Sequence, residues 1–336
     1  MIELADKNKT LKMRFVAFCA AHRFSCPLGL FLVGSVLASP LALLAETVAL
    51  VVGDDAAAHE PVVAETQRLL TAHFSDRFQS KIIPAHELAA TLAQPAKAEA
   101  PHAVVTFGAN AARVAASLSV SGAVLNADIP RGTYEKLAAA HSNPARRSAI
   151  YREQLVARQL ALIKSVAPKS LNIGVIYGAE SAGLSKQLEQ VAATLGLVLV
   201  AETVRRVEDL GPALRRVLKR SDCFLALPDA EIMNTQTMHQ VLRAGYHAGR
   251  LVFGFSPEQI KSGAIAVIFS TPAQSARQIV DFISTVKMGQ KMQLPAPHHP
   301  LYFRVNVNRD VARSFDLSLP ANEKLERIIS DVVEGG

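Results

Sequence analysis

The feature that most constrains the fold is an alternation of short apolar runs with amphipathic stretches, which begins at Glu46. The runs are rich in β-branched residues and apolar at consecutive positions, not at alternate ones. Strands with this pattern are buried on both faces, as in a parallel sheet covered by helices. The runs are TVALVVG (47–53), AVVTFG (103–108), AVLNA (123–127), NIGVIYG (172–178), LVLVAETV (197–204), CFLALP (223–228), LVFGF (251–255) and AIAVIFS (264–270).

Helical patterns separate several of these runs. Leu184, Leu188 and Leu195 share one helical face after NIGVIYG, and Leu210 and Leu214 share another before CFLALP. Repetition of strand, helix and strand with short connections is typical of βαβ units. The predicted fold class is therefore α/β, built from doubly wound parallel sheets.

The chain is long enough for two lobes, and the pattern indicates where it passes between them. The rhythm is interrupted between about Asp128 and Arg152, and a strand-like RSAIY (147–151) follows within that interval. A long amphipathic helix over Thr271–Met288 and a proline-rich connector over Leu294–Pro300 give two further passages. We predict an N-terminal lobe of residues 46–151 and 271–300 and a C-terminal lobe of residues 152–270 and 301–336, joined by a three-segment hinge.

An apolar segment from Pro27 to Ala45 follows a basic stretch between Lys7 and Arg23. A basic region, an apolar region and small residues at its end are typical of a secretory signal. A retained anchor is the alternative, because about 19 apolar residues could span a bilayer. Pro40 and the small residues near the end favour cleavage, so we predict that residues 1–45 are a signal peptide cut near Ala45.

Charge and cysteine content exclude several classes of protein. Removing residues 1–45 takes away five Lys or Arg and two Asp or Glu, so the formal charge falls from +7 to +4. The remaining basic residues are scattered, with no aromatic-interleaved basic stretch, so we expect no nucleic-acid partner. Cys223 is then the only cysteine, and its apolar surroundings predict a core position.

The usual marks of catalysis are missing. There is no G-x-S-x-G, for which Gly254-Phe-Ser256 is the nearest approach, and no P-loop. The first predicted strand ends in Gly53-Asp54-Asp55 instead of the glycine pattern of dinucleotide-binding folds. His298-His299 lies between prolines without further ligands at metal spacing, which indicates a solvated loop. We expect a binding protein with no cofactor and no metal, and keep an α/β enzyme as an alternative.

Several strand ends carry signals for the start of a helix. Ser256-Pro257-Glu258-Gln259 and Thr271-Pro272-Ala273-Gln274 both predict a capping box behind a first-turn proline. Asn110, Ser181 and Asn234 are predicted caps of other helices. Because the strand-to-helix loops of a parallel sheet share its carboxyl edge, where ligands bind, these free N–H groups favour an anionic group of a ligand.

Distinctive segments in a fixed order resemble those of a known family. They are RQLALIKSVAPKSLNIGVIYGAE (158–180), DCFLALPDAEIMN (222–234), RLVFGFSPEQIKSGAIAVIFSTP (250–272), FRVNVNRDVARSFDLSLP (303–320) and, more loosely, PHAVVTFGANAARVA (101–115). Together they resemble the ABC-transporter substrate-binding family of the type I periplasmic fold, whose relatives include aromatic amino-acid binders. The resemblance implies a monomeric, hinged, periplasmic receptor that delivers a small-molecule solute to an inner-membrane ABC permease.

Carried over by position, the resemblance also implies the ligand-binding residues. They are Gly53, Asp54, Asp55, Gly108, Ala109, Asn110, Asn126, Tyr177, Gly178, Glu180, Ser181, Asp229, Ala230, Glu231, Asn234, Phe255 and Ser256. This chain departs from the family at two of these loops. It has Gly178-Ala179-Glu180 where relatives carry N-P, and Asp229-Ala230 where relatives carry T-D. The identity of the ligand is therefore not carried over.

The residue types bound the ligand only by class. The chain has no Trp, but Phe107, Tyr177 and Phe255 could flank an apolar group. Helix starts favour an acidic group, while Asp54, Asp55 or Asp229 would favour an ammonium, so we expect an amino-acid-like zwitterion. Carboxylates that are only solvated or capping are the alternative. The alternative function is a ligand-sensing adaptor of the same fold, acting with a membrane sensor kinase or an outer-membrane receptor.

Overall fold

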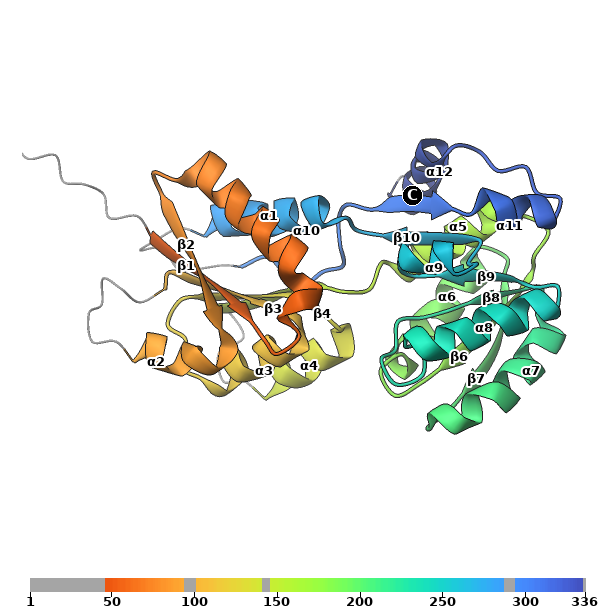
Figure 1. Cartoon of the computed structure of the whole chain (residues 1–336), viewed down its shortest axis with the longest axis horizontal. Coiled ribbons are helices and arrows are strands. Elements are labelled where there is room, and N and C mark those ends of the chain that lie inside the picture. Colours follow the sequence, from red (N-terminus) through yellow and green to blue (C-terminus); the bar gives the residue numbers. More distant parts are fainter. Residues whose placement is uncertain (1–45, 94–100, 141–145, 287–293, 335–336) are drawn as a thin grey trace, which may run out of the picture. The chain divides into compact units, whose positions relative to one another are not determined.

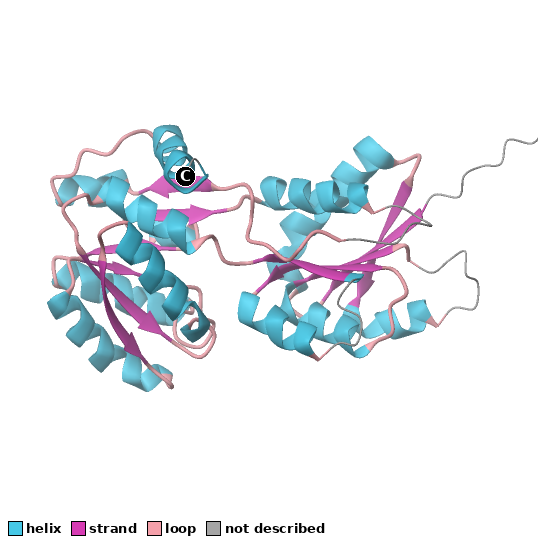
Figure 2. Ribbon diagram, turned by 180° about the vertical axis from the view of Figure 1, so that it is seen from behind, coloured by secondary structure: helices cyan, strands magenta, loops and turns pink. Residues whose placement is uncertain are grey.

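The computed structural model describes residues 46–93, 101–140, 146–286 and 294–334, which form two β-sheets flanked by helices (Figure 1, Figure 2). The predicted signal peptide, residues 1–45, lies outside the described residues. Within the described part of the chain, no helix combines the length and hydropathy that a membrane span requires.

The first sheet has five parallel strands in the order β2-β1-β3-β4-β5. Val48 and Leu50 of β1 contribute to the core under helices α1 and α10 (Pro272–Thr285), whereas Ala49 and Val51 contribute to the core under α3. Burial on both faces explains why this run is apolar at consecutive positions. The elements are β1 (Glu46–Val52), α1 (Ala56–Phe74), β2 (Phe78–Pro84), α2 (Leu88–Leu92), β3 (Ala103–Phe107), α3 (Gly108–Ser117), β4 (Ala123–Ile129), α4 (Arg131–Ala139) and β5 (Arg147–Tyr151).

The second sheet has the order β11-β10-β9-β8-β6-β7, and only the β10–β11 pair is antiparallel. Ile173 and Val175 of β6 share a core with α5, and Ile176 faces α7 and α8. The elements are α5 (Val156–Val166), β6 (Asn172–Tyr177), α6 (Ser185–Thr194), β7 (Val198–Thr203), α7 (Leu210–Arg220), β8 (Cys223–Leu225), α8 (Thr235–His247), β9 (Leu251–Gly254), α9 (Glu258–Lys261), β10 (Ala266–Phe269), β11 (Arg304–Val307), α11 (Arg309–Ser314) and α12 (Asn322–Glu334).

Segments distant in sequence complete both sheets. Helix α10 (Pro272–Thr285) follows β10 of the second sheet but packs against α1, beside which it lies in Figure 1. Strand β11 follows α10 and pairs with β10, and α12 packs against α5. The predicted fold class, with two doubly wound α/β sheets, is confirmed. The predicted core position of Cys223 is also confirmed, because its side chain is fully buried, and this burial raises the pKa of its thiol to about 12.

Two elements lie outside the predicted pattern. Strand β2 is an edge strand in which exposed residues interrupt the apolar ones, so it lacks the consecutive apolar run by which the other strands were identified. Helix α4 lies in the interval between Asp128 and Arg152, where the sequence pattern predicts only an interruption. It buries one large side chain, Tyr134, and therefore carries a weak amphipathic pattern.

Only part of the predicted capping is present. Thr271 forms a full capping box with Gln274, and the side chain of Asn234 caps α8. At α9, the Oε1 atom of Gln259 accepts from the Ser256 N–H, but the Ser256 side chain caps nothing. The prediction for Asn110 is wrong, because α3 begins two residues earlier at Gly108.

Two further predictions of local structure need correction. Ser181 makes no side-chain cap, because its hydroxyl accepts from the Gly178 N–H and donates to Asp229. The His298-His299 segment is not a solvated loop: it lies along β5, where the His298 N–H donates to the Ala149 carbonyl at 3.0 Å. The two prolines keep the segment extended, so it can pair with an edge strand.

Candidate functional site

The candidate site is a cavity of about 540 Å³ lined by residues from both sheets. His59 and Asp128 come from α1 and the end of β4 in the first sheet, and Glu180 and Asp229 follow β6 and β8 in the second. Most other lining residues are apolar. They include Pro61, Val62, Ile150, Met233, Phe255, Ile268 and Phe269. The site thus combines an apolar wall with a small number of charged groups, as ligand pockets commonly do.

Asp229 organises the loops of the second sheet. Its Oδ2 atom accepts hydrogen bonds from the Glu180 and Ser181 N–H groups at 3.1 and 3.0 Å and from the Ser181 hydroxyl at 2.9 Å. Its Oδ1 atom accepts two longer backbone bonds within its own loop. A Cβ on Gly178 would lie 2.5 Å from Oδ2, so this close approach requires glycine. The buried carboxylate therefore holds the loop after β6 against the loop after β8.

Other N–H groups at the cavity are likewise bound by the protein's own side chains. Both carboxyl oxygens of Glu153 accept from the Arg131 N–H at the start of α4, at 3.2 and 3.1 Å. Glu180 accepts from the Ala230 N–H at 2.9 Å. Gln259 accepts from the Phe255 and Ser256 N–H groups at 2.8 and 3.2 Å. Burial raises the pKa of Glu153, and its backbone hydrogen bonds oppose this rise.

A histidine between two aspartates forms the charged part of the first sheet's wall. His59 Nδ1 lies 3.1 Å from Asp128 Oδ2, and His59 Nε2 lies 3.3 Å from Asp55 Oδ2. The hydrogen bond to Asp128 raises the pKa of His59, against the opposing effect of burial. Asp128 also accepts from the Arg152 guanidinium, at 3.4 Å from Nε. Both cationic groups in the lining are therefore already paired with carboxylates.

The backbone is adapted to this cluster. The register of β4 shifts between Ala127 and Ile129, and Asp128 takes a positive φ of 53°. A bulge of this kind re-aims a side chain, here toward His59. Gly108 has a φ of 79°, and a Cβ there would lie 2.5 Å from His59 Nε2. Two predicted site residues, Asp55 and Gly108, thus support His59 without lining the cavity.

The connections between the sheets also meet at the cavity. The Gln154 Nε2 atom donates to the Ser270 hydroxyl at 2.8 Å, and that hydroxyl donates to the Tyr302 carbonyl at 2.7 Å. Arg158 donates to the Gln154 Oε1 atom and to the Pro300 carbonyl at 3.1 and 2.6 Å. Gln159, next to it on α5, lines the cavity, and its buried Oε1 atom has no hydrogen-bond partner within the part of the chain that the structure describes.

The structure brings some of the predicted site residues to the cavity and leaves others outside the lining. Glu180, Asp229, Ala230, Phe255 and Ser256 line it. Gly53, Asp55, Gly108, Gly178 and Ser181 contact or closely approach residues of the loops around it.

The other predicted residues have different surroundings. Asn126 is buried within β4 and bonds to Thr106 and the Ser148 carbonyl. Asn110 accepts from Arg113, and Asn234 caps α8. Tyr177 is buried in the core of the second sheet, whereas Asp54, Ala109 and Glu231 lie outside the lining.

Several lining residues were not among the predicted positions. They are His59, Asp128, Arg152, Glu153, Gln154, Gln159 and Ser270. One signal is present in the sequence: His59 follows Asp55 by four residues, a spacing that brings two side chains to the same side of a helix that starts there. The approach of Asp128, Glu153 and Gln159 depends on long-range packing that no local pattern encodes.

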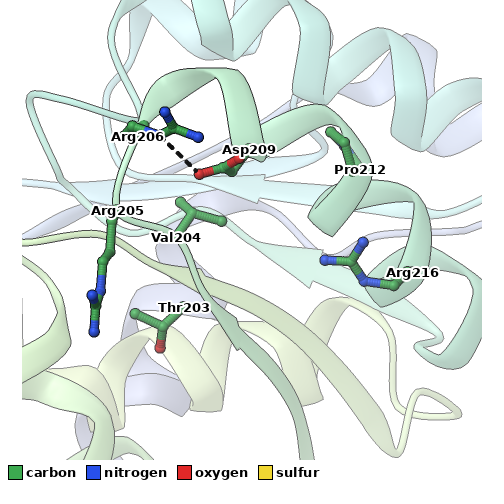
Figure 3. Close-up of a pocket in the computed structure, with 7 residues that line it drawn as sticks. All are labelled: Thr203, Val204, Arg205, Arg206, Asp209, Pro212 and Arg216. Atoms are coloured by element: carbon green, nitrogen blue, oxygen red, sulfur yellow. Dashed lines mark hydrogen bonds and ion pairs between the residues drawn. The ribbon is translucent and has the colours of Figure 1, made fainter.

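A second hollow, of about 570 Å³, lies at the end of β7 and the start of α7. It is lined by Thr203, Val204, Arg205, Arg206, Asp209, Pro212 and Arg216. Figure 3 shows Arg206 paired with Asp209 at 3.5 Å and Arg205 directed away from this pair. Arg216 is bound by Glu202. Because the second sheet alone supplies this lining, the cavity reached by both sheets is the stronger candidate.

Comparisons with known proteins agree on a family and a fold. The model of a family described as ABC transporter substrate binding protein matches residues 79–322. A search of curated proteins by sequence found no match.

Among solved structures, similar ones include a Streptococcus pneumonia ABC domain in complex with L-Trp, at 15% identity and a TM-score of 0.58, covering 84% of this chain and 98% of that one. A conserved domain protein of Vibrio cholerae is 20% identical with a TM-score of 0.59, covering 84% and 97%. The ligand-free, open form of CD0873 of Clostridium difficile, a substrate binding protein with adhesive properties, is 14% identical with a TM-score of 0.63, covering 83% and 97%. At these identities the likeness shows the fold alone.

Proposed function

The chain belongs to the family of ABC transporter substrate-binding proteins, and from that premise we propose that it captures a small solute in the cavity and delivers it to an inner-membrane ABC permease. The observation that carries the proposal is the lining of the cavity by loops of both sheets. Ligands of open α/β folds bind beyond the carboxyl ends of the strands, where the loops after β4, β6, β8 and β9 lie. We place the solute there, against Glu180, Ala230, Phe255 and Ser256.

We further propose that the two sheets belong to two lobes that close on the solute. The N-terminal lobe comprises residues 46–151 and 271–300, and the C-terminal lobe comprises residues 152–270 and 301–336. The Ser270 hydroxyl supports a shared hinge, because it links the first connection, through Gln154, to the third, through the Tyr302 carbonyl. Binding shifts a population of lobe arrangements only if the solute contacts one arrangement better, and the lining of the cavity by residues assigned to both lobes supports such a preference.

The cellular setting follows from the same proposal. A substrate-binding protein acts outside the inner membrane, so residues 1–45 serve as a signal peptide and the mature monomer is periplasmic. The protein carries out no reaction. The solute resembles an amino acid in size, with a charged end held by polar lining residues and a body held by Phe255, Phe269 and Met233.

Two measurements test this function. Protein purified under native conditions is denatured and the released small molecules are identified by mass spectrometry, and the purified compound is then titrated back. We expect one compound per chain, saturable binding and no chemical change of the compound after incubation. Turnover of the compound would contradict a receptor role. Crosslinking in cells then identifies the partner. A crosslink to an ABC permease would support delivery of the solute, whereas a crosslink to a sensor kinase or an outer-membrane receptor would indicate an adaptor role instead.

A further inference from the structure

The cavity lining carries more acidic than basic side chains. Among the described residues, five carboxylates reach it, from Asp128, Glu153, Glu180, Asp229 and Glu258, against the guanidinium of Arg152 and the imidazole of His59. Both cationic groups are already paired with Asp128. A site with this balance attracts a cation and repels an anion, and its apolar walls strengthen both effects by lowering the local dielectric.

A carboxylate of a ligand would find few free donors at this site. In α/β folds an anion commonly binds the N–H groups at helix starts. At three of the loops around the cavity the protein's own acceptors already hold N–H groups: Glu153 binds that of Arg131, Asp229 binds those of Glu180 and Ser181, and Gln259 binds those of Phe255 and Ser256. An anionic ligand would have to displace these bonds, which the loops need for their own conformation.

Acceptors, in contrast, remain without donors. Gln159 is only 3% exposed and lines the cavity, yet among the described residues its Oε1 atom has no hydrogen-bond partner. A buried polar side chain left without partners is unfavourable, which makes it a candidate for pairing with a ligand. The Glu180 Oε1 atom and the Glu258 carboxylate also accept no hydrogen bond from the described residues. The two carboxylates can pair with an ammonium group, and the Gln159 amide, whose oxygen accepts and whose NH2 group donates, can bind a further polar group of the same ligand.

The rest of the lining fits the remainder of such a ligand. Phe255, Phe269 and Met233 provide an apolar wall, and aromatic faces also attract cations. Resting on the proposed function, we infer that the cavity selects an organic cation, an amine with an apolar body, which is recognised through its ammonium group and needs no carboxylate. Of the three groups of an amino acid, the cavity would therefore recognise the amine and the side chain but not the carboxylate.

Three compounds that share a phenyl ring and a short chain test the inference: phenethylamine, L-phenylalanine and 3-phenylpropionate. Each is titrated into the purified protein by calorimetry. We expect phenethylamine to bind at least about tenfold more tightly than 3-phenylpropionate, because only the amine forms charge-assisted hydrogen bonds with the free acceptors. Equal or tighter binding of 3-phenylpropionate would overturn the inference, and so would failure of phenethylamine to bind at millimolar concentration.

Variants that remove charge test which carboxylates bind the amine. The double variant Glu180→Gln and Glu258→Gln keeps the shape of both side chains, and we expect it to weaken phenethylamine binding by about tenfold or more. Glu208→Gln is the matched control, because Glu208 is exposed and lies outside the cavity lining. We expect that control to bind phenethylamine as the wild type does. Equal affinity of the double variant and the control would overturn recognition by these carboxylates.

These experiments distinguish failure of the organic-cation inference from failure of the proposed solute-binding function. A carboxylic acid without an amine, released from the native protein and rebinding saturably, would overturn the organic-cation inference and leave the solute receptor intact. Absence of any released compound, together with no binding of all three probes, would overturn both. An amine recovered from the protein supports both.

Discussion

At the scale of single residues, two carboxylates of the site accept hydrogen bonds from the backbone of the protein itself. Asp229 accepts from the N–H groups of two neighbouring loops, and Glu153 accepts from the start of α4. Such bonds fix loops whose backbone would otherwise lack partners. The expectation that Asp229 attracts an ammonium, drawn from residue type, overlooks these bonds, because they depend on the fold around the side chain.

The closeness of Gly178 to Asp229 gives a test at this scale. We expect Gly178→Ala to reduce the free energy of unfolding by about 1–3 kcal/mol, as overpacking does in a well-packed site, because the new Cβ would meet Asp229 Oδ2 at 2.5 Å. Gly183→Ala is the control, since nothing lies within 4 Å of a Cβ there. Chemical denaturation of both variants measures the difference. Equal free energies of unfolding for the two variants would contradict this expectation, because they would show that the loop accommodates the new Cβ without loss of stability.

At the scale of helices and strands, the sequence predicts what a local pattern encodes. Runs of consecutive apolar residues identify most strands, because parallel strands buried on both faces need them. The edge strand β2 and the helix α4 are missed, since each buries too little to show a clear period. Helix caps likewise follow the local sequence at some positions and long-range contacts at others. Asn234 caps α8, but Ser181 bonds to Asp229 from another loop instead.

The two predicted capping boxes are the test at the scale of elements. We expect Thr271→Val to lower the free energy of unfolding by about 1 kcal/mol, because the Thr271 hydroxyl accepts from the Gln274 N–H. Ser256→Ala should leave it nearly unchanged, since the Ser256 side chain caps nothing in α9. Thermal unfolding of both variants provides the comparison. An equal loss in the two would mean that α9 is capped as the sequence suggests.

At the scale of the whole molecule, the sequence predicts the two sheets but not the composition of the cavity. The lining joins residues from α1, the β4–α4 loop, α5 and the loops of the second sheet. Their meeting depends on the packing of distant segments, so His59, Asp128 and Gln159 could not be selected from spacing alone. The family resemblance identified the loops after β6, β8 and β9, where Glu180, Asp229 and Phe255 do reach the cavity.

If the cavity lined by both sheets is the solute site, a bulky side chain placed in it will block binding. Ala230 is exposed and lines the cavity, whereas Ala193 is exposed on α6 and does not. The compound released from the native protein is titrated by calorimetry into Ala230→Trp and into the control Ala193→Trp. We expect affinity to fall by about tenfold or more in the first variant only. Wild-type affinity in Ala230→Trp would show that the solute binds elsewhere on the protein.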